Sequence, residues 1–169
     1  MSSCAAALTA AFIVTAGSSA SVAHAAATHP PLRPAPAVSS GSCAFKKTEY
    51  ATANAFDEST SENFVNLGDA GSITFAQNGT GCVAGTFFAN AGSSVAGDHI
   101  GLQVLLDGSA CAPLSSGYIF ADTDFSSHSA AFFCGARVAP GKHTIQVQYH
   151  SGFGGNVLFF QRTLEVNHT

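Results

Sequence analysis

Apolar and polar residues alternate along several short stretches of the chain, a pattern that predicts β-strands. The clearest stretch spans residues 142–149, where Ile145, Val147 and Tyr149 fall in one phase and Thr144, Gln146 and Gln148 in the other. Because successive side chains of a strand point to opposite faces, this stretch predicts a strand with one buried and one solvated face.

Comparable runs recur at short intervals and are separated by turn signals such as Asp107-Gly108 and Pro140-Gly141. Only residues 49–63 leave room for a short helical turn. About eight strands without an amphipathic helix predict an all-β fold, an antiparallel β-sandwich whose core the 14 phenylalanines can fill. The other predicted strands cover residues 73–75, 82–89, 100–106, 118–120, 130–138 and 156–166.

The last predicted strand contains an arginine in phase with its apolar residues. These apolar residues are expected to share the buried face: Leu158, Phe160, Leu164 and Val166. Arg162 falls on the same face. Either a bulge near Gln161 or the end of the strand turns Arg162 outwards, which we favour, or Arg162 meets an acid such as Asp107 or Asp122.

The N-terminal residues 1–25 have the features of an export signal. An apolar run over residues 5–16 is too short to span a bilayer, and Ala23-His24-Ala25 matches the A-x-A cleavage pattern, although the first residues contain no Lys or Arg. Residues 26–42 are rich in Pro and Ser and predict a spacer, and residues 43–169 form the predicted sandwich domain. We therefore expect a secreted protein, extracellular or periplasmic, with no integral membrane segment after signal removal.

Four cysteines remain after residue 25: Cys43, Cys82, Cys111 and Cys134. Their gaps of tens of residues do not resemble the close pairs of zinc sites. In a chain that is exported to an oxidising compartment, this spacing predicts two disulfides. Four cysteines allow three pairings, and the shorter loops favour Cys43–Cys82 together with Cys111–Cys134.

Charge excludes one class of partner. The formal net charge is −4, only 9% of residues are charged, and Lys46-Lys47 is the one adjacent pair of basic residues. A chain without a basic stripe cannot neutralise a row of phosphates, so we expect no nucleic-acid binding.

The segments VAPGKHTIQVQY (138–149) and RTLEV (162–166), with LQVLLDG (102–108) upstream, resemble the C-terminal strands of known domains. These are secreted bacterial β-sandwich domains of unknown function and some jelly-roll domains of phage tail proteins. The resemblance covers about the last 70 residues and implies a jelly-roll-like sandwich in a secreted setting. Its motifs are structural, so it implies no catalytic residue.

Motifs for catalysis are scarce. The chain contains no G-x-S-x-G, H-x-H or H-E-x-x-H motif, and bonded cysteines cannot act as nucleophiles, so we expect neither a metal nor a cofactor. Asp122 and Asp124 could offer oxygens to Ca²⁺, but two acids are few for an ion that takes six to eight ligands, and loop acids that cap turns are the simpler interpretation. His143 is expected to tie the Pro140-Gly141 turn to a neighbouring strand through a buried hydrogen bond.

The first hypothesis is a secreted or cell-surface, non-enzymatic β-sandwich with a binding or structural role and a glycan or protein partner. The alternatives are a glycan-binding module, which the absence of Trp disfavours, or a small secreted hydrolase that uses loop residues near Asp122–His128. A glycan binder should show exposed aromatic rings on a flat or grooved face, and a hydrolase should show a cleft with a carboxylate beside a histidine. The expected ligand-binding residues are Asp122, Asp124, Phe125, His128 and Phe153.

Overall fold

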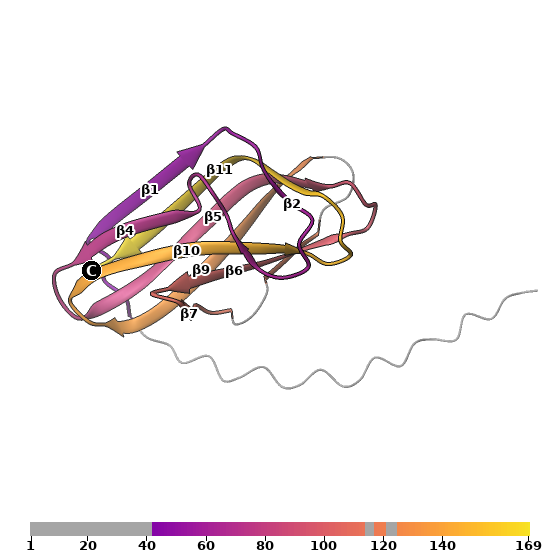
Figure 1. Ribbon diagram of the computed structural model, residues 1–169. Helices are drawn as coiled ribbons and strands as arrows, with labels where there is room; N and C mark the ends of the chain where they lie inside the picture. The colour runs from indigo at the N-terminus through magenta and orange to yellow at the C-terminus, as the bar shows by residue number, and fades with distance from the viewer. Residues whose placement is uncertain (1–41, 114–116, 121–124) are drawn as a thin grey trace, which may run out of the picture. The chain divides into compact units, whose positions relative to one another are not determined.

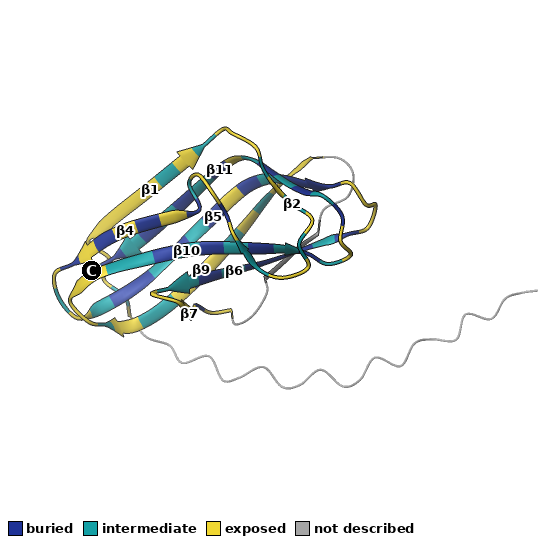
Figure 2. Cartoon of the chain, viewed as in Figure 1, coloured by how far each residue is buried: buried dark blue, intermediate teal, exposed yellow. Residues whose placement is uncertain are grey.

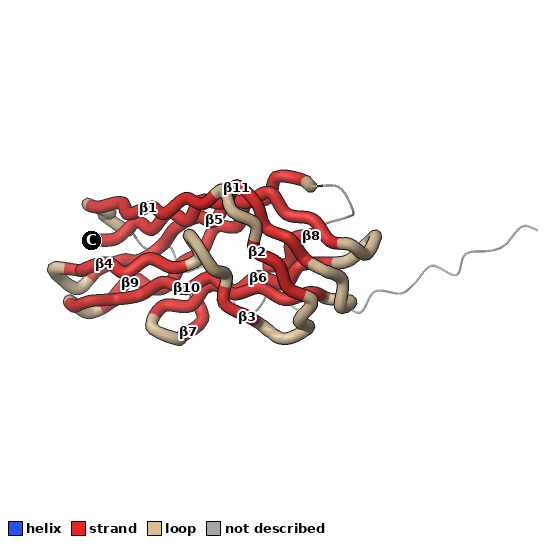
Figure 3. Tube along the Cα trace, turned by 45° about the horizontal axis from the view of Figure 1, so that its top comes forward, coloured by secondary structure: helices blue, strands red, loops and turns tan. Residues whose placement is uncertain are grey.

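The computed structural model describes residues 42–113, 117–120 and 125–169. Within these residues it contains eleven strands and no helix (Figure 3), so the helical turn considered within 49–63 is replaced by strands β1 and β2. The eight longer strands are β1 (Lys47–Ala53), β4 (Ser72–Gln77), β5 (Gly81–Ser93), β6 (His99–Leu106), β8 (Gly117–Phe120), β9 (Ser126–Val138), β10 (Gly141–Ser151) and β11 (Val157–His168). The three short strands are β2 (Asp57–Ser59), β3 (Val65–Asn66) and β7 (Ser109–Ala110).

The strands form two antiparallel sheets (Figure 1). Sheet A has the order β1-β11-β5-β9, with β2 beside β11. In sheet B, β10 pairs with β4 and β3 on one side and with β6 on the other, and β6 pairs with β8 and β7. The eight longer strands can be numbered 1 to 8 in chain order. Sheet A then holds strands 1, 8, 3 and 6, and sheet B holds strands 2, 7, 4 and 5. This order is that of a jelly roll, so the predicted fold class is confirmed.

Buried residues alternate with more exposed ones along the strands (Figure 2), and the buried side chains of both sheets form one core. The alternation is regular in β4 and in β10 from Ile145 onwards, where every second residue is buried. The expected inward residues Ile145, Val147 and Tyr149 are at most 1% exposed and pack against Phe87 and Phe159 of sheet A, among others. The alternation that predicted these strands is therefore the alternation that fills the core.

A bulge in β11 inverts this alternation. The register between β11 and β5 shifts between Phe160 and Thr163, and Gln161 has a positive φ of 47°. An extra residue in one strand moves all later side chains to the other face. The expectation that four apolar residues of this strand share the buried face is therefore wrong: Leu164 and Val166 are buried, whereas Leu158 and Phe160 lie on the outer face with the exposed Gln161.

Arg162 is the largest fully buried side chain, at 1% exposure. Its Nε donates to the carbonyl oxygen of Asp69 at 2.5 Å, and its Nη1 donates to that of Ala55 at 2.7 Å. Its Nη2 lies 3.9 Å from Oδ2 of Asp57. A bulge near Gln161 was expected, but it turns Gln161 rather than Arg162 to the solvent, and the acid that Arg162 meets is Asp57.

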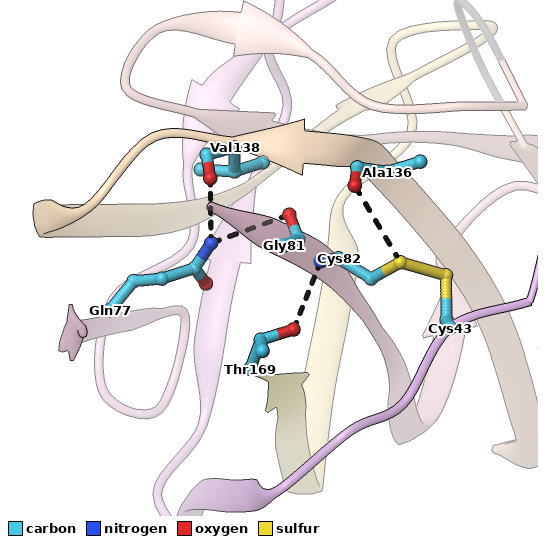
Figure 4. Close-up of a disulfide and its surroundings, with 7 residues drawn as sticks. All are labelled: Cys43, Gln77, Gly81, Cys82, Ala136, Val138 and Thr169. Carbon is cyan, nitrogen blue, oxygen red and sulfur yellow. Dashed lines mark hydrogen bonds between the residues drawn. A yellow bond between two sulfur atoms is a disulfide. The ribbon is translucent and has the colours of Figure 1, made fainter. Parts of the chain in front are cut away.

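Both expected disulfides are present. Cys43–Cys82 fastens the segment before β1 to the start of β5 (Figure 4). At the same place the Gln77 side chain donates to the carbonyl oxygen of Val138, and the Thr169 hydroxyl accepts from the backbone N–H of Cys82. Cys111–Cys134 connects the chain after β7 of sheet B to β9 of sheet A. The second disulfide therefore links the two sheets covalently.

Replacing both members of this link, in a Cys111→Ser/Cys134→Ser variant, is expected to lower the free energy of unfolding by about 3 kcal/mol, since the 23-residue separation closes a loop in the unfolded chain. Urea unfolding in the absence of reductant measures the loss. The control is the wild type with both disulfides reduced, which should be less stable than the variant. Equal stability of variant and oxidised wild type would contradict a stabilising role for this link.

Candidate binding surface

Aromatic side chains gather on the outer face of sheet A, the face turned away from sheet B. Inward neighbours define this face: Phe87 is fully buried while Phe88 is exposed, and Phe132 is buried while Phe133 is exposed. Tyr50 of β1 points the same way, because its neighbour Ala51 packs against the core. Apolar rings are therefore presented to the solvent by several strands of one sheet.

Three phenylalanines on this face contact one another and are called the aromatic cluster: Phe56, Phe125 and Phe160. The rings of Phe56 and Phe160 are stacked, with centroids 4.7 Å apart and planes 19° apart. The Phe125 ring meets Phe56 edge-on at 6.2 Å. Phe56 remains 62% exposed and Phe125 49% exposed, so the contact among the rings does not remove them from water.

A chain of amide and hydroxyl groups borders the aromatic cluster. Asn90 is the register partner of both Phe160 on β11 and Ser127 on β9. The Ser127 hydroxyl donates to Oδ1 of Asn90 at 2.7 Å, and Nδ2 of Asn90 donates to Oε1 of Gln161 at 2.8 Å. These bonds hold three polar side chains in place across β9, β5 and β11, and we call them the amide chain.

The surface around the cluster carries one acidic group and no cation among the described residues of its strands. Glu58 of β2 is exposed two residues after Phe56 and is the register partner of Leu158. Residues 88–92, 126–131 and 158–163 surround it on the three strands, and they include no Asp, Glu or Lys. Their one arginine, Arg162, is turned into the core. The surface therefore combines phenyl rings with groups that both donate and accept hydrogen bonds.

Of the five residues expected from sequence to bind a ligand, the structure describes Phe125, His128 and Phe153, and these three lie in different places. Phe125 belongs to the aromatic cluster. His128 of β9 is the register partner of the buried Ala89 of β5, and its Nε2 lies 2.9 Å from the Ser126 hydroxyl oxygen. Phe153 is 63% exposed in the loop after β10, where its ring lies 5.0 Å from that of His99. Asp122 and Asp124 lie outside the described residues.

Sequence reasoning missed Phe56 and Phe160. Phe56 lies in the stretch considered for a helical turn, and Phe160 was assigned to the core. The signal that could have found Phe160 was Arg162, whose position in phase with apolar residues marked the bulge. Arg162 and Leu164 are both buried, so they share the inner face. Because the bulge shifts the alternation by one residue, Phe160, which lies before the bulge, faces outwards although it is two residues from Arg162.

A buried carboxylate orders the loops at one end of the sandwich. Asp98 is fully buried and accepts hydrogen bonds from the hydroxyls of Ser93 and Ser151, at 2.7 and 2.8 Å. The backbone N–H groups of His99, Gly152 and Phe153 donate to its other oxygen, at 2.8 to 3.1 Å. Burial alone would raise the pKa of Asp98, but these hydrogen bonds outweigh burial and hold the pKa below its usual value. With both oxygens occupied, this carboxylate fixes loops and is not available for catalysis.

A second carboxylate forms a pair with a histidine. Oδ2 of Asp107 lies 2.7 Å from Nδ1 of His143, and Nε2 of His143 lies 2.9 Å from the carbonyl oxygen of Ala139. The hydrogen bond with Asp107 raises the pKa of His143 against the opposing effect of burial. Both ring nitrogens are thus engaged, and His143 secures the turn before β10 as expected, but its hydrogen bonds lie at the surface and are not buried.

Among the described residues, a small, partly open pocket of about 20 Å³ is lined by Leu102 of sheet B, Phe132 of sheet A and Cys111, among others, which is room for about one water molecule. Within the described ranges, no three His, Cys, Asp or Glu side chains are placed to hold a metal ion. The same part of the chain contains no helix long and apolar enough to cross a membrane.

No protein-family model and no curated protein sequence matches the chain. It is similar to part of dimeric latent PorU from Porphyromonas gingivalis, at 8% identity and a TM-score of 0.49, over 74% of this chain and 13% of that protein. It is also similar to the insecticidal δ-endotoxin Cry8Ea1 from Bacillus thuringiensis, at 16% identity and a TM-score of 0.39, over 65% of this chain and 19% of that protein. A third similar structure is the CBM36-1 domain of a multidomain xylanase from the hindgut metagenome of Trinervitermes trinervoides. Its identity is 9% and its TM-score 0.38, over 71% of this chain and 96% of that domain. With TM-scores below 0.5, these likenesses carry no argument about ligand or activity.

Proposed function

We propose that this protein is a secreted, non-enzymatic binding module and that it binds through the outer face of sheet A. The aromatic cluster carries the proposal. Three phenyl rings from three separate segments converge on a solvated sheet face instead of entering the core. Full burial of one such ring is worth about 2–3 kcal/mol, so leaving them in water forgoes stability that a ligand can recover.

The polar groups support binding over catalysis. A hydrolase needs a base with an accessible lone pair near a cleft. Both nitrogens of His143 are engaged, both oxygens of Asp98 are buried, and His128 is on the opposite side of sheet A from the cluster. The hydrolase alternative therefore finds no support among the described residues.

The two disulfides support an extracellular or periplasmic location, because such bonds persist in oxidising compartments. The export signal expected at residues 1–25 agrees with that location.

The proposal is tested on protein exported from a bacterial host by its own N-terminal segment. Intact mass should show cleavage after Ala25 and no free thiol. The exported protein is then applied to a panel of insoluble polysaccharides, gelatin and lipid vesicles, and its self-association is measured by sedimentation. A Phe56→Ser/Phe125→Ser/Phe160→Ser variant should lose at least about tenfold of whichever interaction the wild type shows.

Phe153→Ser is the matched control, since Phe153 is as exposed as Phe56 but lies in another loop. It should leave the interaction unchanged. Retention of full binding by the triple variant, or absence of any interaction of the wild type, would refute the assignment of this face.

A further inference from the structure

We infer that the aromatic cluster and the amide chain together form a subsite for an uncharged saccharide. This inference rests on the proposed function and specifies its ligand. A sugar ring presents C–H groups on its faces and hydroxyls around its rim, so it needs an apolar ring surface beside groups that donate and accept hydrogen bonds. The two sets of residues offer both on one sheet face.

The rings supply the apolar part. Phe160 is held in β11 and supports the Phe56 ring by stacking, while Phe125 contacts Phe56 edge-on. Each ring therefore restrains the next, and the largest remaining exposure belongs to Phe56, at 62%. The negative face of an aromatic ring favours contact with the slightly positive hydrogens of a C–H group.

The amide chain supplies the polar part in a fixed geometry. Asn90 is bonded on one side to Ser127 and on the other to Gln161, so its orientation is set before a ligand arrives. The Gln161 side chain is exposed, and its NH2 group makes no hydrogen bond to a described residue. Polar groups that are already ordered lose little conformational entropy on binding.

The bulge is the observation that separates this site from a merely apolar patch. Regular alternation would place the residue after Phe160 on the inner face. The bulge instead presents Phe160 and Gln161 side by side on the outer face, at the cost of a positive φ that non-glycine residues rarely adopt. A backbone of this kind is characteristic of functional sites, and here it joins a ring to an amide.

Charge decides the class of saccharide. The described strand segments around the cluster carry no Lys, Arg162 is buried, and the exposed acid beside the cluster, Glu58 of β2, would repel an anion. A sulfated or uronic acid polymer would find no cation there, and desolvating its anionic groups without a partner would oppose binding. An uncharged hexose or pentose polymer requires only the rings, amides and hydroxyls that are present.

The test uses the exported wild type and titration calorimetry with uncharged hexasaccharides of β-glucan, xylan and mannan, and with an oligogalacturonate as the anionic probe. At least one uncharged hexasaccharide should bind. Phe56→Ala should weaken its affinity about tenfold, and Asn90→Ala about threefold, the loss expected for one neutral hydrogen bond. Phe153→Ala, the control, should change the affinity less than about twofold.

The outcomes separate the two proposals. If no uncharged hexasaccharide binds, or if the oligogalacturonate binds as well, the saccharide assignment is overturned. If the triple phenylalanine variant then loses binding to gelatin, vesicles or a second copy of the chain, the face still serves binding and only the ligand class was wrong. If saccharide affinity falls in Phe153→Ala but not in Phe56→Ala, both proposals fail.

Discussion

Replacing Asp98 with alanine is expected to lower the free energy of unfolding by about 4 kcal/mol, among the largest effects of any single substitution in this chain. The change removes the acceptor of five hydrogen bonds at a fully buried position. Hydroxyl groups can rotate to other acceptors, but the backbone N–H groups of Gly152 and Phe153 cannot, and each unsatisfied buried donor costs about 1–3 kcal/mol. Urea unfolding of the two proteins at neutral pH measures the difference.

The pH dependence of stability provides a second readout. Since the folded pKa of Asp98 lies below its unfolded value, near 4, its stabilisation is complete above that value and is lost as the pH falls through the folded pKa. Asp98→Asn should therefore lose less stability than the wild type between about pH 5 and pH 2. Asp107→Asn is the matched control: Asp107 also accepts hydrogen bonds, but its side chain is 50% exposed, so at neutral pH the loss should be at most about 1 kcal/mol. A loss of that size for Asp98→Ala would contradict the role of the buried carboxylate.

The sequence was sufficient for the strands that alternate regularly. Ile145, Val147 and Tyr149 are buried as their spacing predicted, and the disulfide pairing is the one that the shorter loops favoured among three. The partners of Asp98 could not be predicted. Its bond to Ser151 spans 53 residues, and nothing in the local sequence marks an aspartate between two loops as buried.

The candidate site was harder to predict for a related reason. Phe125 was identified as a loop aromatic, but its partners were not, because a single extra residue at Gln161 decides which face Phe160 occupies. Sequence periodicity detects a strand, whereas a bulge is a local defect whose position depends on tertiary contacts, here those of Arg162 with Asp57, Ala55 and Asp69.

Arg162→Ala is accordingly expected to lower the free energy of unfolding by about 4 kcal/mol, since removal of one partner of a buried ion pair typically costs about 3–5 kcal/mol. The guanidinium donates to three backbone carbonyl groups, those of Asp69, Ala55 and Phe159. It also lies 3.9 Å from the carboxylate of Asp57, which accepts a hydrogen bond from the buried Tyr149 hydroxyl at 2.6 Å. Without the arginine, three carbonyl groups lose their donor and Asp57 loses its cation. Chemical unfolding again measures the loss.

The same substitution links stability to the binding surface. The buried side chain of Arg162 fixes the backbone directly after the bulge at Gln161. Its removal should therefore relax the bulge and disturb the positions of Phe160 and Gln161. Under conditions where Arg162→Ala remains folded, binding through the outer face of sheet A should weaken although no residue of that face has changed. Arg137→Ala, which removes an exposed arginine of β9, is the control and should alter stability by less than about 0.5 kcal/mol. If Arg162→Ala is destabilised but binds like the wild type, the bulge is held by the strand pairing itself and Arg162 serves the core alone.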